Sequence, residues 1–130
     1  MPREPQTWVW YSEEDIKSAE VLLQGERYLQ VYFHCQQAVE KRLKAVIVQK
    51  TGDLPPKIHD LPRLLTITGL DTEEAVQDFL TDLNELYIVT RYPLEPGFIE
   101  SLCDKTRAED VFEQTGEVVA WLDEQLALNS

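Results

Sequence analysis

The chain has 130 residues, 43% of them hydrophobic, and a formal net charge of −12, which predicts one folded domain over residues 1–130. Two cysteines are too few for a disulfide framework, and Cys35 and Cys103 match no zinc-binding spacing. The apolar runs are too short to span a bilayer, and the first five residues lack the apolar segment of a signal peptide. We therefore expect a soluble cytoplasmic protein with reduced thiols and no membrane partner.

The negative charge is concentrated in the second half of the sequence. Residues 1–65 contain nine bases and nine acids, whereas residues 66–130 contain three bases and fifteen acids. This excess disfavours general binding of duplex nucleic acid and leaves two interpretations, a solvated acidic surface or a docking surface for a basic partner. Because bases outnumber acids between residues 41 and 63, we expect Lys41, Lys44 and Arg63 to form a mildly basic surface region.

Apolar residues recur at helical spacing, and no segment alternates as a strand would. The first helix is expected to begin between residues 7 and 12, where Ser12 and Asp15 resemble a capping box, and to end before Gly25. A continuous apolar stripe predicts the second and longest helix over about residues 27–50. A glycine and two prolines follow that stripe and prevent the helix from continuing.

Local capping signals predict the next two helices. A short helix is expected between Asp60 as its N-cap and Gly69 as its C-terminal residue. Asp71 is expected to cap a fourth helix, with Glu74 completing a capping box. Prolines and a glycine in residues 93–97 are expected to end that helix.

A last helix is expected over about residues 106–126, again with an apolar face. Four long amphipathic helices with short loops predict an all-α fold, an antiparallel up-and-down four-helix bundle with the short helix beside it. The crowded aromatic residues Trp8, Trp10 and Tyr11 cannot all point into one core. We therefore expect an exposed aromatic surface and a homodimer that covers it.

Few residues suggest chemistry, because the sequence has no glycine-rich phosphate loop, zinc-protease motif or serine-hydrolase motif. His34 lies within the second helix and His59 precedes the Asp60 cap, and both positions are compatible with packing or local hydrogen bonding. A metal site would require His34, Cys35, His59 and Cys103 to converge. We expect neither a metal nor a cofactor.

Arg91 is the strongest candidate for a functional side chain. It is the only base between Arg63 and Lys105, and it lies one helical turn after Tyr87, immediately before Tyr92. A cation at a helix C-terminus is favoured by the helix dipole alone. Arginine also presents a planar fork suited to phosphate. Both interpretations, helix capping and anion binding, remain open from the sequence.

Three motifs in fixed order carry a family resemblance. Residues 36–45 read QQAVEKRLKA, residues 59–61 read HDL and residues 91–93 read RYP, and aromatic and leucine residues of the first helix precede them. This order resembles the HEPN domain (higher eukaryotes and prokaryotes nucleotide-binding) in its small stand-alone bacterial and archaeal form, over nearly the whole chain. The resemblance implies a bundle of four helices plus a short one, usually as a homodimer.

The resemblance also implies two kinds of activity. Stand-alone members are commonly encoded beside a minimal nucleotidyltransferase and act with it as a toxin–antitoxin module. Many other members are metal-independent ribonucleases with an Arg-x4–6-His motif, in which His is the general base and Arg stabilises phosphate charge. In this sequence the corresponding positions after Arg91 are Glu95, Pro96 and Gly97, and no histidine follows.

The predicted function is therefore that of an accessory protein that binds a minimal nucleotidyltransferase and contributes a nucleotide- or phosphate-binding site. The residues expected at that site are Arg91, Tyr92, Lys41, Lys44 and His59. One alternative is a ribonuclease toxin with an altered active site, in which Arg91 is catalytic and the base comes from elsewhere in the chain, for example from His59. A second alternative is a nucleotide-binding bundle that acts alone.

Overall fold

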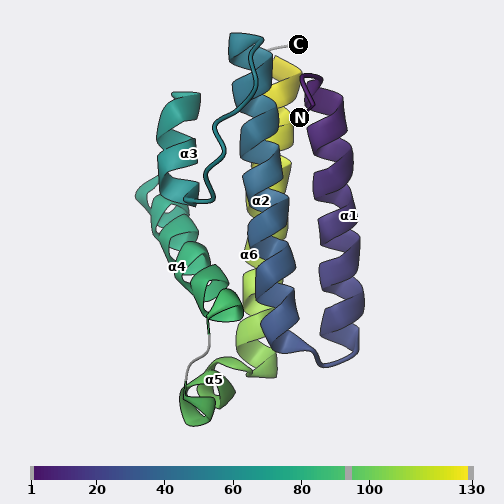
Figure 1. Cartoon of the computed structure of the whole chain (residues 1–130), viewed down its shortest axis with the longest axis vertical. Coiled ribbons are helices and arrows are strands. Elements are labelled where there is room, and N and C mark those ends of the chain that lie inside the picture. Colours follow the sequence, from purple (N-terminus) through teal and green to yellow (C-terminus); the bar gives the residue numbers. More distant parts are fainter. Residues whose placement is uncertain (1, 93–94, 129–130) are drawn as a thin grey trace.

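The computed structural model describes residues 2–92 and 95–128, and these residues form six helices and no strand. The helices are α1 (Pro5–Gln24), α2 (Tyr28–Thr51), α3 (Leu61–Thr68), α4 (Glu74–Arg91), α5 (Pro96–Leu102) and α6 (Lys105–Leu128). Figure 1 shows α2 in the middle, α1 on one side, α3 and α4 on the other, and α6 behind α2. Helices α1 and α4 run opposite to α2 and α6, which confirms the predicted all-α, up-and-down bundle.

Three of the predicted helix ends are formed by the residues expected to form them. The Asp60 side chain accepts a hydrogen bond from the backbone N–H of Arg63 at 3.2 Å and so caps α3. Gly69 after α3 and Gly52 after α2 have φ angles of +71° and +72°. Glycine adopts this left-handed conformation without steric cost, so both residues end their helices as predicted.

Two predicted helix starts are wrong. Helix α1 begins at Pro5, so Ser12 lies inside it and forms no capping box; its hydroxyl donates to the carbonyl of Ala38 at 2.6 Å. Helix α4 begins three residues after the predicted Asp71 cap, and its N-cap residue makes no side-chain capping bond. The end of α1 at Gln24 is as predicted, although the left-handed φ, +60°, belongs to Glu26 rather than to Gly25. At both wrong starts, the residue expected to cap the helix does not do so.

Helix α5 is absent from the sequence-based prediction. The prolines and glycine of residues 93–97 were expected only to end the preceding helix, and Pro93 lies outside the described residues. Pro96 instead occupies the first turn of α5. Proline has a φ suited to that position and lacks an N–H that the first turn would leave unbonded, so it can begin a helix as well as end one.

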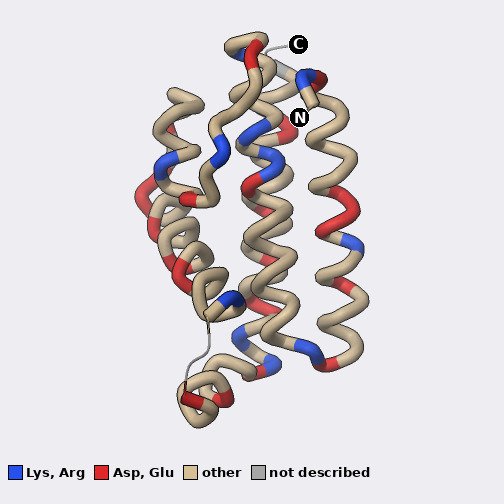
Figure 2. Tube along the Cα trace, in the orientation of Figure 1, with Lys and Arg blue, Asp and Glu red and all other residues tan. Residues whose placement is uncertain are grey.

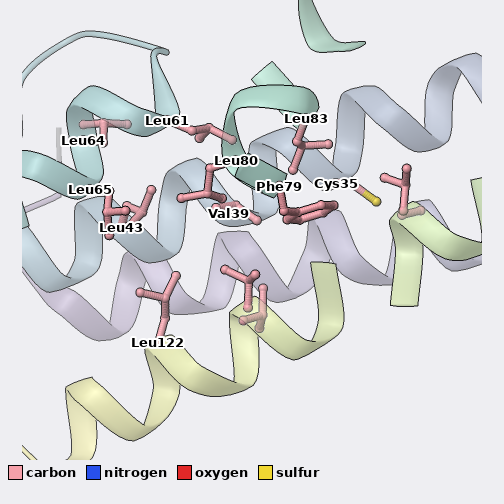
Figure 3. Close-up of a cluster of buried hydrophobic side chains, with 14 of the residues drawn as sticks. Cys35, Val39, Leu43, Leu61, Leu64, Leu65, Phe79, Leu80, Leu83 and Leu122 are labelled. Atoms are coloured by element: carbon pink, nitrogen blue, oxygen red, sulfur yellow. The ribbon is translucent and has the colours of Figure 1, made fainter. Parts of the chain in front are cut away.

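The apolar core is one continuous cluster to which α2 contributes most. Leucines from α2, α3, α4 and α6 meet in it with no exposed surface (Figure 3), among them Leu43, Leu61, Leu80, Leu83 and Leu122. Trp8 is buried at the edge of this core, whereas Trp10 and Tyr11 are 58% and 49% exposed. None of the helices in the described ranges is long and apolar enough to cross a membrane.

A buried arginine joins three of the long helices. Arg42 of α2 is 2% exposed and donates to the Ser12 hydroxyl at 2.7 Å and to Glu13 at 2.8 Å, both on α1. It also donates to Asp123 of α6 at 3.0 Å. Burial lowers the pKa of Arg42, but the hydrogen bonds to Asp123 and Glu13 outweigh this effect and raise it. The guanidinium therefore stays charged inside the bundle and fixes α1 and α6 on α2.

Candidate functional site

A histidine–carboxylate pair lies where the chain between α2 and α3 returns along α2. The Nδ1 atom of His59 is 2.9 Å from Oε1 of Glu40. The Glu40 side chain is only 5% exposed, whereas that of His59 is 57% exposed. Since a carboxylate only accepts hydrogen bonds, the neutral ring carries its proton on Nδ1. The Nε2 lone pair is then left to accept a proton or a hydrogen bond.

The Glu40 carboxylate is held in place by its own helix. Lys44 Nζ donates to Glu40 Oε2 at 3.0 Å, and Gln36 Nε2 donates to Oε1 at 3.2 Å. The Gln36 amide also donates to the backbone carbonyl of His59 at 2.9 Å. Residues four apart lie on one face of a helix, so these three side chains form a buried polar row beneath the histidine. This row fixes both the carboxylate and the chain that carries His59.

Arg91 and His59 meet at the ring of Tyr87. Arg91 Nη1 donates to the Tyr87 hydroxyl at 2.6 Å, and its Cζ lies 5.5 Å from the ring centre. The His59 ring centre lies 6.1 Å from that of Tyr87, and Phe33 stacks on Tyr87 at 5.7 Å. Tyr87 is only 5% exposed. The buried Tyr87 and the partly exposed Phe33 thus support two exposed nitrogen-bearing side chains, one from α4 and one from the chain before α3.

The Arg91 guanidinium is exposed at the C-terminus of α4. The hydrogen bond to Tyr87 is the main cause that raises the pKa of Arg91, so the side chain is a permanent cation. Among residues 2–92 and 95–128, no carboxylate forms an ion pair with it. The helix dipole contributes to its placement, yet its remaining N–H donors stay open to an anion.

The structure brings together only part of the predicted site. Tyr92 follows Arg91 and is 63% exposed. Lys44 is 3% exposed and paired with Glu40, so it is not part of a basic surface. It acts on the site indirectly, through that carboxylate. Arg63 is exposed on α3 and contributes only its backbone N–H to the Asp60 cap.

Lys41 belongs to a second cluster between α1 and α2. Its ammonium group is 2.6 Å from Asp15 Oδ2 and 6.0 Å from the ring centre of Tyr11. His34 Nδ1 is 2.9 Å from Asp15 Oδ1. Asp15 is 7% exposed and is paired with both of these side chains. His34 and Lys41 therefore have a local role, since they compensate a buried carboxylate.

Glu40 and Gln36 belong to the motif of residues 36–45 but are not among the predicted site residues. The available signal was the spacing of Gln36, Glu40 and Lys44, which places them one turn apart on α2. In the described part of the chain, no three His, Cys, Asp or Glu residues are grouped so that they could hold a metal ion. Cys35 lies in the core, where burial raises the pKa of its thiol to about 12.

Comparison with known proteins gives one family and two similar folds. Residues 5–125 match the family model of the HEPN domain. The crystal structure of TT1696 from Thermus thermophilus is similar with a TM-score of 0.78 and 23% identity, over 92% of this chain and 96% of that one. ST0689, described as an archaeal HEPN homologue, has a TM-score of 0.76 and 21% identity, over 96% and 98%. No curated protein sequence matches significantly.

Proposed function

Because the chain belongs to the HEPN domain family, we propose that it is an accessory protein that binds a nucleotide or related phosphate compound and docks to a minimal nucleotidyltransferase. The observation that carries the binding proposal is the exposed guanidinium of Arg91, held over Tyr87 and without an ion-pair partner among the described residues. An exposed guanidinium without an ion-pair partner is well suited to bind an anion, and Arg91 is such a group within an otherwise acidic segment.

The neighbouring side chains suit a nucleotide. One N–H of Arg91 is used by the Tyr87 hydroxyl, and the remaining donors can bind two phosphate oxygens in parallel. The exposed ring of Tyr92 offers a surface on which a base can stack. His59 contributes a further N–H donor when its ring is protonated. The acidic surroundings favour a small anion over a long polyanion such as RNA.

The binding proposal is tested by calorimetric titration with ATP. We expect weak binding by the wild-type protein and none by Arg91→Ala, with little change in stability, because a solvent-exposed cation at a helix end contributes little to folding. Arg63→Ala is the matched control, since Arg63 is exposed but bonded only through its backbone. Equal loss of binding in both variants, or unchanged binding in Arg91→Ala, would contradict the proposal.

The partner proposal is tested by co-expression with a minimal nucleotidyltransferase, if a neighbouring reading frame encodes one, or otherwise with one from another HEPN gene pair. We expect the two proteins to co-elute, and we expect Lys41→Gln, which removes the charge but keeps a donor for Asp15, to weaken the complex and reduce its salt dependence. Lys44 is unsuitable for this test, because reversal of its charge would place two carboxylates together in the interior. Absence of a complex at micromolar concentration would refute the partner proposal and leave the binding proposal standing.

A second candidate function, a metal-independent ribonuclease, is favoured by the Glu40–His59 pair. A general base needs a neutral imidazole in a fixed orientation, and the buried Glu40 orients this ring while the His59 side chain remains 57% exposed. In this mechanism His59 removes the proton of a ribose 2′-hydroxyl, the resulting oxygen attacks the adjacent phosphorus, and Arg91 stabilises the phosphate charge. The bond between phosphorus and the 5′-oxygen breaks, the leaving oxygen takes a proton from water, and the products are a 2′,3′-cyclic phosphate and a 5′-hydroxyl end.

Incubation with single-stranded RNA separates the two functions. The accessory-protein proposal predicts intact RNA. The ribonuclease candidate predicts cleavage that is lost in both His59→Ala and Arg91→Ala, reduced in Glu40→Gln, and absent with a DNA oligonucleotide that lacks the 2′-hydroxyl. His34→Ala is the matched histidine control, because His34 pairs with Asp15 in the other cluster.

A further inference from the structure

A shallow groove runs between α4 and α6, away from the site around Arg91. It consists of two adjoining hollows that share Phe79 and Gln114. Apolar side chains of both helices line it, including Val76, Leu86, Val111, Val118 and Trp121. From Glu73 to Leu86 the groove follows α4 for roughly 20 Å, at about 1.5 Å per residue. This length matches between three and four turns of a docked helix.

Carboxylates border this apolar floor on both sides. Glu73 and Asp82 of the α4 side and Asp110 and Glu117 of α6 are all exposed, and Arg107 is the one base that lines the groove. Within the described residues, none of these four carboxylates is part of an ion pair. Figure 2 shows acidic residues following one another along α4.

We propose that the α4–α6 groove binds a basic amphipathic helix of another protein. An apolar strip on that helix would cover the floor, and lysines or arginines on its flanks would meet the four carboxylates. A second copy of this chain fits the groove poorly, because a twofold pairing of these faces would place carboxylate against carboxylate. The inference is independent of the phosphate-binding proposal, because Arg91 does not line the groove.

The test uses a labelled 18-residue peptide of leucine and lysine at helical spacing, with a second peptide that carries glutamate in place of lysine. We expect the lysine peptide to bind and to shift backbone amide resonances of α4 and α6. The double variant Asp82→Lys/Glu117→Lys should weaken binding at least about tenfold. The matched control, Glu14→Lys/Glu20→Lys, changes net charge equally at exposed positions of α1 and should weaken binding less than about threefold.

Three results would overturn the inference. Equal weakening in both double variants would mean that net charge alone attracts the peptide. Equal binding of the glutamate peptide would remove the argument from charge complementarity. Amide shifts confined to α1, α2 or the surroundings of Arg91 would place the peptide elsewhere on the molecule.

Discussion

Two buried titratable side chains, the Cys35 thiol and the Tyr32 hydroxyl, make the stability of this fold depend on pH. Burial raises the pKa of Cys35 from 9.0 to about 12 and that of Tyr32 from 10.0 to about 12. The Tyr32 hydroxyl donates to the carbonyl of Leu102, at the end of α5. In both cases the neutral form fits the folded state better than the charged form.

We therefore predict that stability falls in alkaline solution. A raised folded-state pKa on an acidic group means that the unfolded chain loses its proton first. The contribution of Cys35 is complete below pH 9 and is lost progressively as the pH rises towards 12. Urea denaturation at about pH 8 and pH 10 measures this loss, and Cys35→Ala should lose less stability between the two. An equal loss in that variant would contradict the assignment to Cys35.

The surroundings of a residue decide which of the predicted site residues reach the surface. Arg91 and His59 were recognised from their neighbours in the sequence, since a helix end and an N-cap are local features. The contact of His59 with Glu40 spans nineteen positions and depends on the path of the chain after α2. Lys44 was expected to be a surface base, yet its side chain is 4% exposed, pairs with Glu40 and lies 5.8 Å from the ring centre of Trp8 on α1.

At the scale of helices, the bundle depends on leucines that α4 and α6 insert against α2. Leu83 and Leu122 have no exposed surface. We predict that Leu83→Ala and Leu122→Ala each lower the free energy of unfolding by about 2–5 kcal/mol, because each leaves a cavity. Leu54→Ala is the control, since Leu54 is 42% exposed and should change stability by less than about 0.5 kcal/mol. Urea denaturation checks all three, and a small effect at Leu83 would mean that the core collapses around the cavity.

The helix boundaries show what local sequence determines in this fold. The start and end of α3 follow from Asp60 and Gly69, whose effects act within one turn. Asp71 resembles Asp60 in sequence but does not cap α4. The start of α5 at Pro96 was missed because proline is equally typical of the end of one helix and the start of the next. The apolar faces of the helices could be predicted, because the helical repeat of apolar residues is a local property of the sequence. Which helix packs against each face could not be predicted in this way.

At the scale of the whole molecule, two aromatic side chains of α1, Trp10 and Tyr11, remain exposed to solvent in the single chain. Trp10 and Tyr11 contact each other edge to face at 5.0 Å and are about half exposed. We propose a homodimer that buries them, as expected from the sequence. Sedimentation at micromolar concentration should give twice the 15.1 kDa chain mass.

The aromatic pair also provides the variants for this prediction. Trp10→Ser/Tyr11→Ser should shift the protein to a monomer. Val21→Ser is the control, because Val21 is 67% exposed on the same helix two turns or more away. A monomeric wild-type protein would refute the dimer, and an unchanged dimer in the double variant would place the interface on another face.

The short connection between α1 and α2 has a consequence for the order of folding. Only residues 25–27 separate the two helices, which lie side by side along their length (Figure 1). Contacts between them close short loops and lose little chain entropy, whereas α6 reaches α2 only after more than fifty intervening residues have been arranged. We expect pulse-labelled hydrogen exchange during refolding to show α1 and α2 protected first and α6 last. The groove between α4 and α6 is then the last surface of the molecule to form, and a partner that binds there would meet only fully folded chains.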